Sequence, residues 1–134
     1  MEKRDTFRIK DDILLPANKG NISSVLYYDM HFNYVEVRML EEKFTIKGEV
    51  PVFILYTSED EENPIQYYET EVPFGGTIEC SGCSEEMIED ITFAIINKNL
   101  TVTPDGDGEE RAFEIEIILD MNIRAYEVEE PEIL

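Results

Sequence analysis

The sequence of 134 residues has no tryptophan, one histidine, two cysteines, and only 11 basic side chains against 31 acidic ones. No apolar run approaches the roughly 20 residues that a helix needs to span a bilayer. The charged residues 1–5 are not followed by the apolar stretch of a signal peptide. A formal charge of −20 repels phosphate backbones and anionic lipids. We therefore expect neither nucleic-acid binding nor direct membrane insertion.

The chain does contain an ordinary globular share of apolar residues. At 43%, this share is enough for a core and too high for a disordered acidic tail. The length corresponds to one domain, since about 150 residues is typical. We expect a single β domain over residues 1–134. Because the chain ends without a closing turn, we also expect this domain to be excised from a longer multidomain protein.

The excess of acid is confined to one part of the sequence. Residues 1–47 hold eight bases and eight acids, whereas residues 48–134 hold three bases and 23 acids. An acidic surface prevents self-association, which is the simplest explanation. It would also steer a basic partner or bind divalent cations weakly. The sequence leaves these alternatives open.

Two long segments have apolar side chains at every second position, which is typical of strands. One runs from Phe44 to Tyr56, and the other runs from Phe113 to Ala125. Turn residues at 58–64 and 104–108 separate further apolar runs. We expect a hairpin over about residues 30–57 and additional strands over residues 6–15, 65–72, 77–80, 91–96, 100–102 and 113–125.

Two short segments favour helical turns. Asn21 has the chemistry of a helix cap and precedes apolar residues with helical spacing over 22–26. Ser84 is followed by acidic residues that suit the positive end of a helix dipole, so we expect one helical turn over 84–90.

Other features predict interruptions of strands. The apolar phase changes near Tyr34 and Val35, which indicates a bulge. Pro51 cannot donate a ladder hydrogen bond, so a bulge or an edge position is expected there. Residues 73–76 and 97–99 are expected to break strands. Seven or eight strands at short spacing predict an all-β fold, an antiparallel β-sandwich or open barrel with one or two short helical turns.

Cys80 and Cys83 form a C-x-x-C pair. Such a pair supplies two of the four ligands of a structural zinc, or a redox disulfide. The chain has no other cysteine and only one histidine, His31, and the β-rich context lacks the helix on which thioredoxin-type motifs lie. Two reduced thiols in a loop, or an adventitious disulfide, is the simpler interpretation. His31 has no nucleophile motif to serve, so we expect a solvent-facing strand histidine.

The segment Asp105-Gly-Asp107-Gly-Glu109 is similar to the start of a calcium loop, but an EF-hand requires flanking helices. A hairpin turn is favoured, with weak calcium affinity as the alternative. Each of the pairs 27–28 and 67–68 places one tyrosine on each face of a strand, and the exposed ring would mark a binding surface. We predict no catalytic, cofactor or metal-binding residues and can assign no binding residues.

Several segments together carry a family resemblance. They are residues 44–56 (FTIKGEVPVFILY), 68–76 (YETEVPFGG) and 117–126 (IILDMNIRAY), with residues 15–22 (LPANKGNI) before them. This order of strands and turns resembles the SPOCS domain of clostridial spore-envelope morphogenetic proteins, of which SipL is the named example. The resemblance extends over about residues 7–126 and includes no active-site motif.

The resemblance implies a non-catalytic structural domain without a cofactor, which mediates protein–protein contacts in coat assembly. Its place would be the mother-cell cytoplasm, at the forespore surface. Its partner would be a spore coat or envelope protein, and the acidity of the chain suggests a basic one. Family members often carry a C-terminal LysM domain, and the chain has no LysM-like segment. Two alternatives remain: a carbohydrate or cell-wall binding β-sandwich, and a hydrolase that uses two of the many carboxylates.

Overall fold

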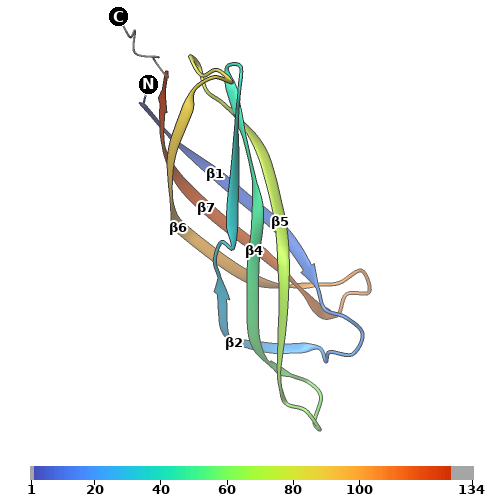
Figure 1. Cartoon of the computed structure of the whole chain (residues 1–134). Helices are drawn as coiled ribbons and strands as arrows, with labels where there is room; N and C mark the ends of the chain where they lie inside the picture. Colours follow the sequence, from blue (N-terminus) through green and yellow to red (C-terminus); the bar gives the residue numbers. More distant parts are fainter. Residues whose placement is uncertain (1, 128–134) are drawn as a thin grey trace, which may run out of the picture.

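The computed structural model describes residues 2–127, and all of their regular elements are strands of two antiparallel sheets (Figure 1). One sheet has the order β1-β7-β6. In the other, β4 is central, with β2 and β3 in succession along one edge and β5 along the other. The expected all-β sandwich is confirmed. The strands are β1 (Glu2–Leu14), β2 (Ile22–Met30), β3 (Tyr34–Leu40), β4 (Lys43–Ser58), β5 (Ile65–Glu79), β6 (Ile88–Pro104) and β7 (Glu110–Tyr126).

The core lies where the inner faces of β4 and β7 meet. The alternation predicted for both strands is confirmed, because the apolar parity of each is buried. The rings of Tyr56 and Phe113 join the two sheets edge to face, with centroids 6.2 Å apart. The buried apolar side chains of this parity are Phe44, Ile46, Val50, Val52, Ile54 and Tyr56 from β4, and Phe113, Ile115, Ile117, Leu119, Met121, Ile123 and Ala125 from β7.

The helix predicted over residues 22–26 is wrong, because these residues begin β2. Register shifts between Ile22 and Ser24 and between Val25 and Tyr27 insert extra residues into the strand. Ile22 and Val25 therefore both lie on the inner face although they are three positions apart. Two bulges thus produce the spacing that resembles a helix.

The bulge predicted at Tyr34–Val35 is also wrong, because the β3–β4 ladder is regular and the apolar phase changes in a gap between strands. In this gap His31 N donates to Pro51 O at 3.4 Å, and Asn33 N donates to Glu49 O at 3.2 Å. The N–H and C=O groups of a strand residue point to the same side. The missing N–H of Pro51 therefore faces the gap, and Pro51 has a local edge position without a bulge.

Strand β5 is continuous through residues 73–76, which contradicts the predicted break. The carbonyl of Glu49 points away from β5, toward Asn33 in the gap between β2 and β3. Its opposite residue Pro73 therefore has no ladder hydrogen bond to make with β4. Gly76 allows the Phe7 ring of β1 to contact the backbone, since a Cβ there would lie 2.5 Å from Phe7 Cε2. The absence of a side chain at residue 76 is therefore used for packing and not for a turn.

Strand β6 is likewise continuous through residues 97–99 and has a bulge between Ile95 and Asn97. The helical turn predicted over 84–90 is wrong, because the segment contains a single tight turn in which Met87 N donates to Ser84 O at 3.2 Å. Long strands on both sides of this segment leave too few residues for a helix.

Arg111 anchors the connection between β1 and β2 onto β7. Its Nη1 donates to the carbonyl of Lys19 and to Oδ1 of Asn21, and its Nη2 donates to the carbonyl of Pro16, each at 2.8 Å. The Tyr56 hydroxyl donates to the carbonyl of Gly20 at 3.3 Å in the same place. Burial raises the pKa of Tyr56, and the nearby Arg111 charge opposes this shift.

Replacing Arg111 should therefore destabilise the fold. We expect Arg111→Met to lower the free energy of unfolding by about 1.5–3 kcal/mol, since charge-assisted hydrogen bonds to part-buried groups are lost. Urea unfolding followed by circular dichroism measures this change. Arg38→Met, at an exposed position, is the matched control and should leave stability nearly unchanged. Equal midpoints for the two variants would contradict this role of Arg111.

Gly48 gives a second stability prediction, because it is buried in β4 against Tyr34 and Phe74. A Cβ at this position would overlap the carbonyl oxygen of Tyr34 and would lie 2.9 Å from the Phe74 ring. We expect Gly48→Ala to cost about 1–3 kcal/mol of stability through overpacking. Gly106→Ala is the control, since no heavy atom lies within 4 Å of its Cβ position. Thermal unfolding of both variants measures the difference, and a Gly48→Ala protein as stable as the control would refute the steric argument.

Candidate interaction surface

The two outer faces of the sandwich differ in character. On the β1-β7-β6 sheet, bases of β1 pair with acids of β7. Arg4 and Asp120 lie 2.6 Å apart, and Arg8 and Glu116 lie 2.7 Å apart. The hydrogen bond from Arg4 lowers the pKa of Asp120 below its usual value. A hollow of about 550 Å³ on this face includes the Arg4–Asp120 pair in its lining. The charges of this face are thus largely compensated.

The outer face of the β2-β4-β5 sheet instead carries a row of aromatic rings. Tyr27, Phe53 and Tyr67, here called the aromatic row, come from β2, β4 and β5. Their ring centroids are 6.3 Å and 6.1 Å apart, and the Phe53 and Tyr67 rings are stacked. Tyr27 is 57% exposed and Tyr67 is 54% exposed. Tyr28 and Tyr68 pack against the core, so the prediction of one inner and one outer tyrosine in each pair is confirmed.

A shallow groove of about 420 Å³ lies beside Phe53. Its lining comes from three segments, namely the gap between β2 and β3, the middle of β4 and the facing part of β5. The register places Glu69 opposite Phe53 and Glu71 opposite Pro51. The groove therefore has an apolar floor and an acidic side. Its lining residues are His31, Pro51, Val52, Phe53, Glu69, Thr70 and Glu71.

Three carboxylates, Glu49, Glu69 and Glu71, form what we call the acidic rim. Within residues 2–127, no ion pair joins these side chains to a base. A hydrogen bond with Glu71 is the main reason that the pKa of Glu49 is raised above its usual value, and desolvation and repulsion from Glu71 add to it. The side chains of Glu49 and Glu71 thus lie close enough to each other for protonation of Glu49 to be favoured.

Cys80 and Cys83 form a disulfide, and both side chains are buried. The structure thus shows the disulfide alternative and not two reduced thiols. Cys80 N donates to the carbonyl of Glu42 at 3.0 Å, and Glu42 N donates to the carbonyl of Cys83 at 2.9 Å. These bonds hold Glu42, which has a positive φ of 60°, in the turn between β3 and β4. The disulfide loop therefore fixes one end of the sandwich.

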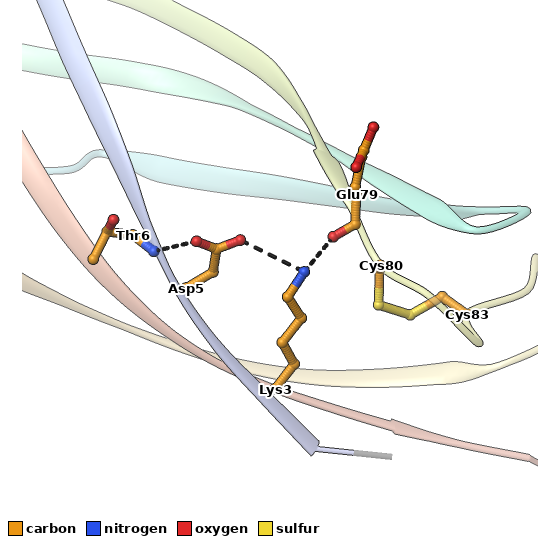
Figure 2. A network of polar contacts seen from close by, with 6 residues as sticks. All are labelled: Lys3, Asp5, Thr6, Glu79, Cys80 and Cys83. Carbon is orange, nitrogen blue, oxygen red and sulfur yellow. Dashed lines mark hydrogen bonds and ion pairs between the residues drawn. A yellow bond between two sulfur atoms is a disulfide. The ribbon is translucent and has the colours of Figure 1, made fainter.

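The same end is closed from β1, as Figure 2 shows. Lys3 Nζ donates to the carbonyl of Glu79 at 2.6 Å, immediately before the disulfide loop, and lies 3.7 Å from Asp5. The Asp5 carboxylate also accepts a bond from Thr6 N at 2.8 Å. Lys3 thus joins the edge strands β1 and β5 of the two sheets.

The other residues considered in the sequence do not gather into a site. His31 is exposed in the gap between β2 and β3, not in a strand as predicted, and lies 3.4 Å from Asp29. Asp105 Oδ1 accepts bonds from the backbone of Asp107 and Glu109 at 2.9 Å, which closes the predicted hairpin turn. Among the described residues, no cluster of three or more histidine, cysteine or acidic side chains is arranged to hold a metal ion.

These features define the domain as an antiparallel β-sandwich with one aromatic, acidic outer face. A family model for the SipL SPOCS domain matches residues 21–103, which is more than half of the chain. The chain belongs to this family and is a sporulation-related, SipL-type domain. No curated protein and no solved structure matches it. Within residues 2–127, no helix is long and apolar enough to cross a membrane.

The matched region includes the aromatic row and the acidic rim but ends before β7. Sequence reasoning identified the two tyrosine pairs but missed Phe53 and the acidic rim. The available signal was the position of Phe53 in the alternation, because an apolar residue among the outward-facing positions of β4 is expected to be exposed. Its neighbours depend on the register of β2 and β5 against β4, which the sequence does not specify.

The contact between Glu49 and Glu71 gives a pH prediction. In Glu71→Gln, the pKa of Glu49 should fall toward its usual value, because the hydrogen bond between the two carboxyl groups and their repulsion are both lost. A raised pKa in the folded chain contributes stability at low pH, and this contribution is lost as pH rises through the folded pKa. Carboxyl-carbon NMR titration measures the pKa directly. Glu69→Gln is the control, and an equal shift of the Glu49 pKa in both variants would contradict the specific pairing.

Proposed function

We propose that this SPOCS domain is a non-catalytic interaction domain of a spore-envelope morphogenetic protein. In this proposal it contributes to coat assembly at the forespore surface, in the mother-cell cytoplasm. The observation that supports it most is the exposed aromatic row, which lies within the region matched by the family. Exposed tyrosines clustered around an apolar centre are typical of interface hot spots.

The geometry of the row suits docking of a protein. Its three rings lie on three neighbouring strands of one sheet, so their backbone positions are fixed before binding. Side chains that are already ordered lose little conformational entropy on association. The open groove beside Phe53 would admit a side chain of the partner. Family membership, whose implied role is structural, supports the non-catalytic assignment.

The aromatic row also favours a second candidate function, the binding of a carbohydrate or cell-wall polymer. Sugar rings stack on exposed aromatic faces, and the neighbouring carboxylates would accept hydrogen bonds from hydroxyl groups. Titration with peptidoglycan fragments should then change tyrosine fluorescence, since Tyr27 and Tyr67 would be covered. An unchanged signal up to millimolar fragment would remove this candidate.

The interaction function predicts specific capture of envelope proteins from sporulating cells. We expect the wild-type chain to enrich coat or envelope proteins, identified by mass spectrometry. For the double variant Tyr27→Ser/Tyr67→Ser, the enrichment should be about tenfold lower, because hot-spot aromatic side chains are removed.

The matched control is Ile88→Ser/Ile96→Ser, which removes apolar side chains that are 57% and 58% exposed on β6. This control should retain capture. Recovery of no coat or envelope protein by the wild-type chain would refute the proposed function. Equal loss in the two double variants would refute the assignment of the aromatic row.

A further inference from the structure

We infer that the segment docking on the outer face of β5 is an extended, basic polypeptide with the facing pattern apolar-x-basic-x-basic. The inference rests on the proposed function and deepens it, because it states the chemistry and spacing of the partner. It is carried by the order of side chains along β5, where Tyr67, Glu69 and Glu71 lie at every second position of the outer face.

Charge complementarity selects a basic occupant. Glu49, Glu69 and Glu71 have no basic partner within ion-pair distance among the described residues. In contrast, Asp120 and Glu116 on the opposite face are paired with arginines. The chain as a whole carries a formal net charge of −20 at pH 7. A second copy of this chain would bring like charge to the acidic rim and be repelled. A cationic segment would instead be attracted.

The hydrogen-bonded Glu49–Glu71 pair argues further for a cation over a neutral sugar. The two carboxyl groups lie close together on the paired strands β4 and β5, so one guanidinium or ammonium group could pair with both. Both carboxylates would then be ionised and hydrogen-bonded to the incoming charge. A sugar hydroxyl has no charge with which to offset the repulsion between the two carboxylates.

The spacing along β5 determines the pattern within the partner. Side chains on one face of a strand repeat every two residues, about 6.6 Å. An extended segment lying along β5 has the same repeat, so successive facing side chains meet Tyr67, Glu69 and Glu71 in turn. Lys19 Nζ already lies 4.8 Å from the centroid of the Tyr67 ring and would repel a second cation there, so the residue next to Tyr67 should be apolar. The next two facing residues should be basic.

The test is an NMR titration of the full isotope-labelled chain with the capped peptide Phe-Ser-Arg-Ser-Arg. We expect saturable shifts of the amides of Phe53, Tyr67, Glu69 and Glu71. The isomer Phe-Arg-Arg-Ser-Ser has the same composition but adjacent arginines, and it should bind at least about fivefold more weakly. Ser-Ser-Arg-Ser-Arg, which lacks the apolar residue, should also bind more weakly.

Variants of the chain distinguish specific binding at the acidic rim from attraction by the net negative charge of the chain. Glu69→Gln/Glu71→Gln should lower the affinity for the peptide Phe-Ser-Arg-Ser-Arg by about tenfold. Glu85→Gln/Glu86→Gln removes the same charge from exposed positions between β5 and β6, and should lower this affinity less than threefold. Equal losses in both variants, or equal binding of the two peptide isomers, would overturn the inference.

The same titration also detects the two alternative occupants of this face, a glycan and a second copy of the chain. Shifts of the same amides by the tetramer of N-acetylglucosamine, with none by the peptide, would assign the face to a glycan and overturn the inference. Concentration-dependent shifts of the free chain at these amides would assign it to a second copy and overturn it as well.

The outcomes for the inference and for the proposed function differ. If envelope-protein capture is lost in Tyr27→Ser/Tyr67→Ser but unchanged in Glu69→Gln/Glu71→Gln, the interaction function stands and the basic pattern is wrong. If the peptide binds as predicted but no envelope protein is captured, the basic pattern stands and the proposed function is wrong.

Discussion

The burial of the inner face of β4 against that of β7 is the constraint on which the rest of the structure depends. Each strand presents an unbroken apolar parity, and each is the central strand of its sheet. A one-residue register shift of either strand would turn all of its apolar side chains toward solvent. The register of β4 and β7 therefore determines which face of each neighbouring strand lies against the core. The outer parity of β4 is left free by this arrangement. Phe53 is therefore exposed because the opposite parity is required for the core.

The same arrangement explains how one very acidic chain presents two different surfaces. Pairing of β1 with β7 brings the bases of the first residues against acids that are more than 100 positions away, such as Arg4 against Asp120 and Arg8 against Glu116. Glu49 of β4 and Glu69 and Glu71 of β5 come from the acid-rich part of the chain. The nearby bases are used elsewhere, because Lys47 pairs with Glu36 and Lys19 lies over the Tyr67 ring. Uncompensated charge therefore collects around the aromatic row, where a partner of opposite charge would be both attracted and oriented.

Much of the fold was predictable from sequence, because the long strands bury one face and so alternate clearly. The inner faces of β4 and β7, the hairpin between β3 and β4 and the turn at 104–108 are of this kind. The errors fall on strands whose local signals were overridden by pairing. Bulges in β2 created helix-like spacing, and Pro73 is accommodated because its nitrogen points away from β4. For the candidate site, the exposed tyrosines were predictable, but their meeting with Phe53 was not.

The sequence by itself determined the all-β class, the apolar faces of the core strands and the uneven distribution of charge, because these follow from the order of residues within a segment. The tertiary structure alone decided which strands became neighbours, and hence that Tyr27, Phe53 and Tyr67 form one row. It also decided that Arg111 holds the connection between β1 and β2 and that Glu49 meets Glu71. The physical reason is that strand pairing joins residues distant in the chain, and its register is fixed by packing of the whole core.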